Sequence, residues 1–426
     1  MKKQSVIREC SFQEAHRAII TALQPLEQEP ILLFQSLGRI NGRTICAERP
    51  KPFYDQSTRD GFALAEQPSA FDASWAEFQI RGEQAAGCTE QQQVVAGQAY
   101  RIMTGALPPS GTARVVPFEI CREEGEKIFV PQEALLEKEL HIRPQGQDVK
   151  LGQILVSAGT RLCPEHLLLL TEEGVEQVAV YRRPRVAVVC TGSELIKNGE
   201  NPLPGQKVSS NGMLLASLLQ AEQCQVAGTE TVGDDADKII ARIQEVINQE
   251  QPDLVITTGG MGPGKFDLLE QVVSRLGGKP IYNRLQIRPG KSTLFAIIGS
   301  TPLFALPGPP PAVRLLFHEL IVPGLHRLQG LPSRDEPASD LVDAVVKGPV
   351  RFRRSGHLVL KSAVASVGNG QVQVRPTKRL EPMNAIMHLA CPKEEKEHGE
   401  IAKGQQVQVR LLGSLATVNE IDEINE

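Results

Sequence analysis

The chain has 426 residues, and the usual size of protein domains predicts about three of them at this length. Lys and Arg total 46 against 50 Asp and Glu, so the formal net charge of −4 argues against a general nucleic-acid-binding protein. Aromatic residues make up only 4%, which leaves little for stacking on bases. A hydrophobic content of 41% is enough to build cores and excludes a disordered chain.

Eight cysteines are scattered along the chain, and none of them forms a C-x-x-C pair. This spacing indicates neither a zinc ribbon nor a thioredoxin-type site, and the thiols are predicted to be reduced. The first residues lack the apolar segment of a secretion signal, and the longest apolar runs fall far below the ~18 residues that span a bilayer. We therefore predict a cytoplasmic protein that contacts no membrane.

The N-terminal half begins with a helix and continues in short segments. Ser11 and Glu14 have capping-box spacing, which predicts a helix over about 11–24 with its apolar residues on one face. Over about 31–150, closely spaced turn residues divide the chain into short apolar segments, a pattern typical of small β-rich modules. A second helix is predicted over 164–174, because it starts with Pro and ends on Gly.

The pattern changes at about residue 185, where buried-type strands begin to alternate with helices as far as about residue 330. This alternation predicts a doubly wound α/β domain with a parallel sheet. The predicted strands are the segments RVAVVCTG, QVAGTETV, DLVITTGG, TLFAII and LFALPG.

The C-terminal part follows a polar, Pro-containing linker at 331–339 and is predicted to be a small all-β domain of about 90 residues. Its strands are HLVLKSAVASV, QVQVRPT and QVQVRLLGS, and Gly-Asn-Gly at 368–370 indicates a hairpin between the first two.

Four polar loops follow strands of the predicted α/β domain, and ligands of such domains bind at the carboxyl ends of the strands. We therefore expect these loops to lie at one edge of the sheet. They are Thr191–Glu194, Gly233–Asp235, Thr257–Gly264 with Asp267 just beyond, and Leu306–Pro310.

The glycine-rich loop is the most informative of the four. Its G-G-x-G-x-G run would let backbone N–H groups approach an anion at the start of the next helix. The run fits neither a Walker A motif nor a dinucleotide-binding fingerprint, and a tight turn without a ligand remains the alternative. Glu194, Asp235 and Asp267 could hold Mg²⁺ beside it. The alternative for each carboxylate is a helix cap or a solvated loop charge.

Two further segments give weaker indications of function. Arg284, Arg288 and Lys291 surround a Pro-Gly turn and could clamp an oxyanion, with an exposed edge strand as an equal alternative. The polar segment 51–62 has the composition of an ordinary surface loop.

Taken together, the motifs resemble those of the molybdopterin molybdenumtransferase family, which comprises the MoeA proteins and the gephyrin E domain. The similarity extends over almost the whole chain. The matching motifs are P-F-Y-D-Q-S-T-R-D-G-F-A at 52–63, R-I-M-T-G-A at 101–106, R-P-Q-G-Q-D at 143–148, V-Y-R-R-P-R-V-A-V at 180–188, C-T-G-S-E-L at 190–195 and S-S-N at 209–211.

The resemblance implies a multi-domain α/β plus β fold, with a molybdopterin-binding-type doubly wound domain, and a subunit that forms a homodimer. The implied divisions are an N-terminal helix (1–28) packed on the α/β domain, a linking domain I (29–51 and 152–181), a β-rich domain II (52–151), an α/β domain III (182–331) and a C-terminal β domain IV similar to a small barrel (332–426).

The resemblance also implies a reaction: insertion of molybdate or tungstate into adenylylated molybdopterin, with Mg²⁺ present and AMP released. The site would lie between the α/β domain of one subunit and the β-rich domain of its partner. The implied catalytic residues are Asp60, Thr104, Asp148, Glu194, Asp235 and Asp267, the last three being the Mg²⁺ ligands. The implied substrate-binding residues are Arg143, Gly259, Gly260, Gly262, Gly264, Arg288, Lys291 and Gly308.

The chain departs from the family's motifs at several of these loops. Met261-Gly262-Pro263 replaces V-S-x in the glycine loop, Arg288 replaces a Lys, and Pro309 and Ala312 replace an Asn and a Ser. These changes remove donors that would grip molybdate or pterin. Besides the transferase, two hypotheses therefore remain open: a non-catalytic paralogue that binds a pterin or a protein partner, and an enzyme acting on another nucleotide-linked substrate.

Overall fold

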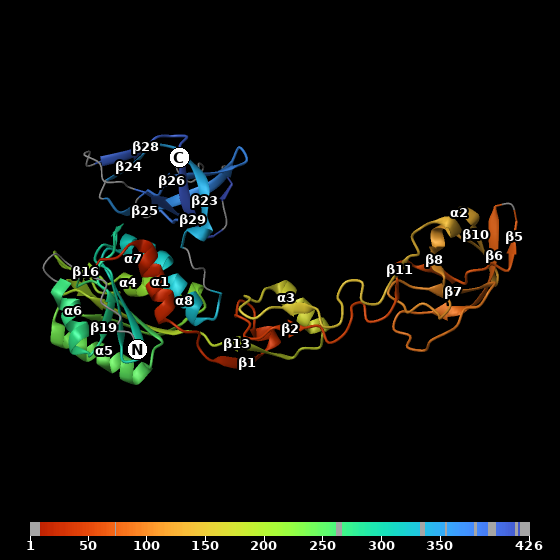
Figure 1. Cartoon of the computed structure of the whole chain (residues 1–426), viewed down its shortest axis with the longest axis horizontal. Coiled ribbons are helices and arrows are strands. Elements are labelled where there is room, and N and C mark those ends of the chain that lie inside the picture. The colour runs from red at the N-terminus through yellow and green to blue at the C-terminus, as the bar shows by residue number, and fades with distance from the viewer. Residues whose placement is uncertain are drawn as a thin grey trace.

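The molecule is elongated, with an α/β unit and a C-terminal barrel at one end, a β-rich unit at the other and a small linking unit between them (Figure 1). The computed structural model describes residues 9–72, 74–260, 266–332, 337–353, 356–378, 381–390, 398–413 and 416–417. No helix within these ranges is both long enough and apolar enough to cross a membrane.

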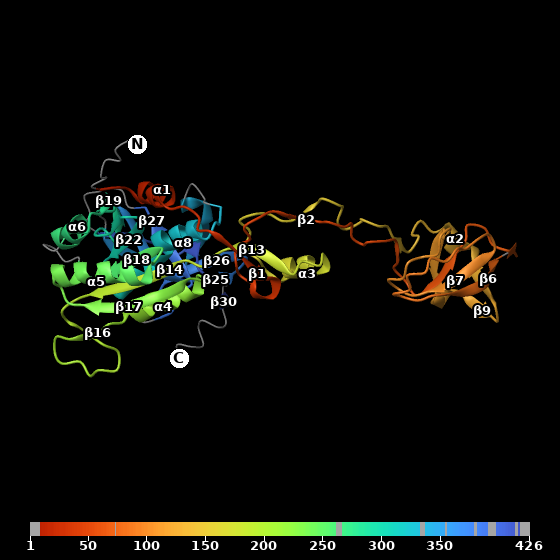
Figure 2. The same ribbon diagram turned by 90° about the horizontal axis from the view of Figure 1, so that it is seen from below.

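Helix α1 (Phe12–Ala22) confirms the predicted N-terminal helix and its capping box. Ser11 Oγ accepts a hydrogen bond from the Glu14 backbone N–H at 3.2 Å, and Glu14 Oε2 accepts one from the Ser11 N–H at 2.8 Å. The helix lies along the α/β unit beside α8 (Val322–Leu328) (Figure 2). Its buried face shares a core with that unit through Phe12, Ala15 and Ile19.

The linking unit is built from two stretches of chain that flank the β-rich unit in sequence. Two antiparallel strand pairs and helix α3 enclose a core that includes Leu33, Leu162 and Leu170. Its elements are β1 (Gln28–Leu32) paired with β13 (Gln177–Tyr181), β2 (Ile45–Cys46) paired with β12 (Ile154–Val156), the 3₁₀ turn η1 (Leu33–Gln35) and α3 (Pro164–Glu172). The helix predicted over 164–174 is thus confirmed.

The β-rich unit is a curled sheet whose inner face buries Phe62, Phe78 and Ile128. Its strand order is β8 (Arg114–Pro117), β4 (Gly61–Leu64), β7 (Gln98–Ile102), β6 (Trp75–Gln84), β10 (Lys127–Pro131) and β9 (Arg122–Glu124). The remaining elements are β5 (Ala70–Phe71) beside β6, the turn η2 (Phe118–Ile120), the helix α2 (Gln132–Leu136) and the pair β3 (Gln56–Ser57) and β11 (Ile142–Arg143).

The α/β unit contains a six-stranded sheet in which the first four strands are parallel. The order is β17 (Gln225–Val232), β14 (Arg185–Thr191), β18 (Leu254–Thr258), β22 (Thr301–Leu306), β21 (Leu294–Ile298) and β19 (Lys279–Tyr282). The prediction of a parallel sheet does not hold at β21, which pairs antiparallel with both β22 and β19. Only Gly299 and Ser300 join β21 to β22, and a parallel crossover needs about a dozen residues or more.

Helices cover both faces of this sheet. Successive strand residues point to opposite faces, so Val186 and Val188 join one core and Ala187 joins the other. The second face is covered by α5 (Ala236–Glu250) and α6 (Phe266–Arg275). The first is covered by α1, α8, α4 (Asn211–Ala221), α7 (Pro310–Leu316) and the π-helical turn η3 (Phe317–Ile321).

The C-terminal unit is a closed five-stranded barrel, which confirms the predicted barrel-like β domain. Asn369 and Gly370, with φ of 53° and 73°, form the predicted hairpin turn between the two strands that they join. The barrel closes in the order β25 (Leu358–Gly368), β26 (Gln371–Pro376), β23 (Leu341–Val346), β29 (Gln406–Leu411), β27 (Ala385–Leu389) and back to β25. Outside it are β24 (Val350–Arg353) paired with β28 (His398–Ile401), β30 (Ala416–Thr417) and the turn η4 (Pro337–Asp340).

Candidate functional site

A cavity of about 690 Å³ lies at the carboxyl ends of the parallel strands of the α/β unit. All four loops expected from the sequence border it. The lining residues are Thr191, Gly192, Glu194, Leu195, Lys207, Val208, Ser209, Ser210, Asn211, Asp234, Gly259, Gly260, Pro307, Gly308, Pro309 and Pro310. The structure thus gathers Glu194, Gly259, Gly260 and Gly308 of the predicted site residues in one cavity.

The start of the glycine loop packs tightly against the end of β14. Gly259 has a φ of +91°, and a Cβ atom there would lie 2.0 Å from the Thr191 carbonyl oxygen. Gly260 also has a positive φ of +66°. Glycine is therefore required at Gly259, because any side chain would displace the neighbouring backbone. The rest of the loop, including the predicted Gly262 and Gly264, lies outside the described residues.

Asn211 ties two of the loops together from the first position of α4. Its Nδ2 donates to the Gly308 carbonyl at 2.8 Å and to Thr258 Oγ1 at 3.2 Å. Its Oδ1 and the hydroxyl of Thr191 are buried and have no hydrogen-bond partner among the described residues. Buried polar atoms are normally paired, so both atoms are available to a ligand in the cavity.

The two aspartates of the second loop have different positions. Asp235 is the N-cap of α5: its Oδ1 accepts a hydrogen bond from the Lys238 backbone N–H at 3.0 Å, and the residue does not line the cavity. Asp234 lines it instead, with its backbone N–H donating to Ser193 Oγ at 3.0 Å. The sequence analysis named Asp235 as a site residue and did not name Asp234. The helical pattern starts at Ala236, so the residue before it, Asp235, has the position of an N-cap, and this was the signal in the sequence.

The cavity offers two described carboxylates, Glu194 and Asp234, for a divalent cation. Within the described ranges, no three His, Cys, Asp or Glu side chains form a group that could hold a metal ion by themselves. Mg²⁺ is usually held by one or two carboxylates together with waters and substrate phosphates, so this donor set fits a substrate-bridged Mg²⁺. Asp267 lies in the first turn of α6, but its side chain lies outside the described residues.

The predicted cations are not at this cavity. Arg288 lies in β20 (Ile287–Arg288), which pairs in parallel with β25 of the barrel, and neither Arg288 nor Lys291 lines the cavity. Among the described residues, the cation that lines it is Lys207. Lys207 belongs to β16 (Lys207–Val208), which pairs with β15 (Leu195–Ile196). Sequence reasoning missed this residue, because only the pairing of two short strands brings it beside Glu194.

The other predicted residues form two contacts in the β-rich unit. Asp60 Oδ1 accepts hydrogen bonds from the backbone N–H and the hydroxyl of Thr104, at 2.6 and 2.8 Å. These bonds, chiefly the one from the backbone, lower the pKa of the Asp60 carboxyl below its usual value. Arg143 forms an ion pair with Asp148. Its strand β11 pairs with β3, and Ser57 of β3 in turn bonds to Gly105 and Ala106, so both contacts belong to one group of loops.

Within one chain these two contacts lie far from the cavity, because the linking unit separates the β-rich unit from the α/β unit (Figure 1). The predicted residues therefore form two separate groups: Asp60, Thr104, Arg143 and Asp148 at one end of the molecule, and the cavity-lining residues at the other.

Known proteins resemble this chain throughout its length. The sequence profile of the MoeA N-terminal region (domains I and II) matches residues 10–174, and that of a probable molybdopterin-binding domain matches residues 187–327. Molybdopterin molybdenumtransferases of Staphylococcus epidermidis and Bacillus subtilis are both 32% identical. The alignments cover 75% of this chain and 76% of the S. epidermidis protein, and 73% of both chains for B. subtilis. The crystal structure of a MoeA protein from Pyrococcus horikoshii superposes with a TM-score of 0.76 at 24% identity, covering 96% of this chain and all of the other.

The fold and the cavity define a multi-domain protein built around a molybdopterin-binding-type α/β domain. The chain belongs to the molybdopterin molybdenumtransferase family, which confirms the resemblance seen in its motifs. It is thus a transferase of molybdenum cofactor biosynthesis.

Proposed function

We propose that this enzyme inserts molybdate or tungstate into adenylylated molybdopterin and releases AMP, as a cytoplasmic homodimer that depends on Mg²⁺. The observation that supports this proposal is the cavity at the sheet edge. Tight glycine turns, two carboxylates and unpaired buried acceptors meet there within about 690 Å³. Such a mixture suits a ligand that carries both phosphate groups and a polar ring system.

Each lining group has a role in this proposal. The backbone at Gly259 and Gly260 approaches the phosphates of the substrate, since no side chain stands in the way. The Asn211 Oδ1 and the Thr191 hydroxyl bond to the pterin, and Lys207 neutralises part of the phosphate charge. Glu194 and Asp234 would hold Mg²⁺, with Asp267 as a further predicted ligand. When bound, Mg²⁺ would polarise the phosphoanhydride whose cleavage releases AMP.

The second group of residues would complete the site from a partner subunit. Asp60, Thr104, Arg143 and Asp148 cannot reach the cavity of their own chain, because the linking unit holds them at the far end (Figure 1). The linking unit also exposes apolar side chains at Leu32, Phe34, Leu37 and Leu168. Exposed apolar patches of this kind commonly mark interfaces, and a two-fold dimer would bring each β-rich unit to the other chain's cavity.

The test is an AMP-release assay with adenylylated molybdopterin and Mg²⁺, in the presence of molybdate, of tungstate or of neither. AMP release that requires one of the oxyanions is expected, and the more effective oxyanion identifies the metal that is inserted. Pterin binding without AMP release under any of these conditions would contradict the proposal.

One observation favours the second candidate, a paralogue that binds without insertion. Helix α7 begins at Pro310, with Pro309 as its cap and Pro311 following. None of these three residues has a backbone N–H, so this helix start offers an oxyanion fewer donors than usual. If the protein is such a paralogue, a fluorescent pterin should bind in the cavity with an affinity that molybdate does not change. The transferase instead predicts coupled binding of the two ligands.

A further inference from the structure

The thiol of Cys190 lies just below the lining of the cavity at the sheet edge. Cys190 belongs to β14, is only 1% exposed and directly precedes Thr191 and Gly192, which line the cavity. The register of the parallel strands places it opposite Thr231 of β17 and Thr258 of β18. Side chains that lie opposite one another in neighbouring strands point to the same face of a sheet. The sulfur is therefore flanked by two threonines on the face that α4 covers.

Three hydrogen-bond donors converge on the Cys190 sulfur. The hydroxyls of Thr258 and Ser209 donate to it, and so does the backbone N–H of Gly212 in the first turn of α4. This turn packs against the sulfur, because a Cβ atom at Gly212 would lie 3.8 Å from it. Burial raises the pKa of the Cys190 thiol by more than these donors lower it. The thiol therefore stays protonated at neutral pH and serves as an uncharged acceptor.

Thr258 connects this sulfur to Asn211. A hydroxyl group has one hydrogen, so Thr258, which donates it to Cys190, can only accept from its other neighbour. That neighbour is Asn211, whose Nδ2 lies 3.2 Å from Thr258 Oγ1. The second hydrogen of Nδ2 goes to the Gly308 carbonyl at 2.8 Å. Both amide hydrogens are thus used within the protein, and Oδ1, which has no partner among the described residues, is left for a ligand.

Ser209, which lines the cavity, is held in the same way. Its Oγ accepts a hydrogen bond from Thr231 Oγ1 at 3.2 Å and donates to the sulfur of Cys190. Without that sulfur, the hydroxyl hydrogens of Thr258 and Ser209 would each need a new acceptor, because an unsatisfied buried donor costs free energy. The acceptor next to Thr258 is the amide of Asn211, and a turn of this amide to receive the hydrogen would withdraw its oxygen from the ligand.

We propose that Cys190 is a positioning residue of this enzyme. Its sulfur takes up the hydroxyl hydrogens of Thr258 and Ser209. It thereby fixes which hydrogen-bonding groups Asn211 and Ser209 present to the substrate. Cys190 itself acts from outside the lining, and no covalent step is assigned to its thiol. The identity of the ligand rests on the proposed function, in which the Oδ1 of Asn211 bonds to the pterin.

The test compares Cys190→Ala with Cys190→Ser. The two substitutions remove nearly the same volume, but only serine keeps an acceptor for the two hydroxyls. In the AMP-release assay, Cys190→Ala should raise KM for the pterin about fivefold or more and leave kcat within about twofold, because Asn211 holds the pterin equally in the ground and transition states. Cys190→Ser should keep KM close to wild type. Equal KM values for the two variants would overturn the proposal.

Crystal structures of the same two variants give a readout that needs no activity. In Cys190→Ala, the Asn211 amide should lose its 3.2 Å bond to Thr258, whereas Cys190→Ser should keep it. An amide that keeps this bond in Cys190→Ala would overturn the proposal. If the amide moves as expected but the wild type releases no AMP, the proposed reaction fails and the positioning role stands. Thr258→Val breaks the same connection with a side chain of the same shape, and it should raise KM likewise if Cys190→Ala does not fold.

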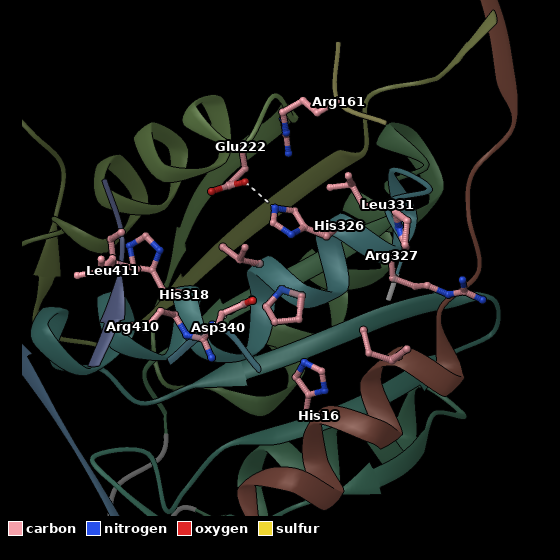
Figure 3. Close-up of a pocket in the computed structure, with 15 residues that line it drawn as sticks. His16, Arg161, Glu222, His318, His326, Arg327, Leu331, Asp340, Arg410 and Leu411 are labelled. Atoms are coloured by element: carbon pink, nitrogen blue, oxygen red, sulfur yellow. Dashed lines mark hydrogen bonds and ion pairs between the residues drawn. The ribbon is translucent and has the colours of Figure 1, made fainter. Parts of the chain in front are cut away.

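Cys224→Ala is the matched control, because it removes another thiol of the same core. Cys224 is 6% exposed, but it directly precedes β17 and so lies at the opposite edge of the sheet. Its thiol donates to the carbonyl of Glu222 at 3.6 Å. Glu222 lines a separate cavity of about 670 Å³ (Figure 3), which shares no lining residue with the cavity at the sheet edge. Cys224→Ala should leave KM unchanged, and a rise equal to that of Cys190→Ala would overturn the proposal.

Discussion

At the scale of single residues, two adjacent aspartates, Asp234 and Asp235, occupy different positions. Asp234 lines the cavity, whereas Asp235 accepts the Lys238 N–H and caps α5. The composition of the Gly-Asp-Asp loop does not distinguish the aspartate that lines the cavity from the one that caps the helix. Their positions one residue apart at a strand-to-helix junction place Asp234 on the cavity and Asp235 at the start of the helix.

This difference predicts opposite effects for two substitutions. Asp234→Asn should lower AMP release at least tenfold without a change in thermal stability, because it removes a charge from the cavity. Asp235→Ala should destabilise the protein by about 1 kcal/mol through the lost cap and leave turnover close to wild type. Turnover and melting temperature are measured for both variants. A loss of activity in Asp235→Ala alone would reverse the assignment.

At the scale of an element, a salt bridge in the barrel gives stability a pH dependence. Glu381 forms a bidentate pair with Arg375, at 2.6 and 2.9 Å, and also accepts the Lys378 N–H. The Arg375 hydrogen bonds lower the pKa of Glu381 from 4.5 to about 2. Because the folded pKa is the lower one, the stabilisation is present above pH 4.5 and is lost as the pH falls toward 2.

We therefore expect Glu381→Gln to destabilise the barrel by about 2 kcal/mol at pH 7 and to have almost no effect near pH 2. Scanning calorimetry of the full chain at several pH values measures the difference. Glu400→Gln is the matched control, because its partner Arg351 is 81% exposed and such surface pairs contribute little. Equal effects of the two substitutions at pH 7 would contradict this prediction.

At the scale of the whole molecule, the proposed site requires two chains. Phe34 of the linking unit is 74% exposed and lies among other exposed apolar side chains of that unit. Phe34→Glu should produce a folded monomer by light scattering, with AMP release largely lost. Phe71→Glu changes a phenylalanine of the β-rich unit that is 64% exposed and should leave both properties unchanged. A fully active Phe34→Glu monomer would exclude the composite site.

Subunit mixing tests the same arrangement without disturbing the interface. Asp60→Asn and Asp234→Asn should each be inactive alone. Co-expressed in equal amounts, they should recover on the order of one quarter of wild-type turnover, because half of the dimers would contain one intact site of two. If both residues served one site within a single chain, mixing would restore nothing.

Much of this architecture could be predicted from the sequence, since its signals are local. The Ser11–Glu14 capping box and the Asn369-Gly370 turn depend on neighbours a few residues apart. Runs of buried-type residues such as RVAVVCTG revealed the strands of the α/β unit. The direction of β21 differs from the prediction because a two-residue link to β22 is too short for a parallel crossover and permits only an antiparallel pair.

The sequence alone determined the element types, the division into an α/β part and a C-terminal barrel, the four loops at one sheet edge and the family. These follow from local periodicity, turn chemistry and motif order. Only the tertiary structure decided that Asp234 and Lys207 line the cavity, that Arg288 joins a barrel strand and that His16, Arg161 and His326 line one further cavity. These contacts join residues that are distant in the chain, and the packing of whole units sets their geometry.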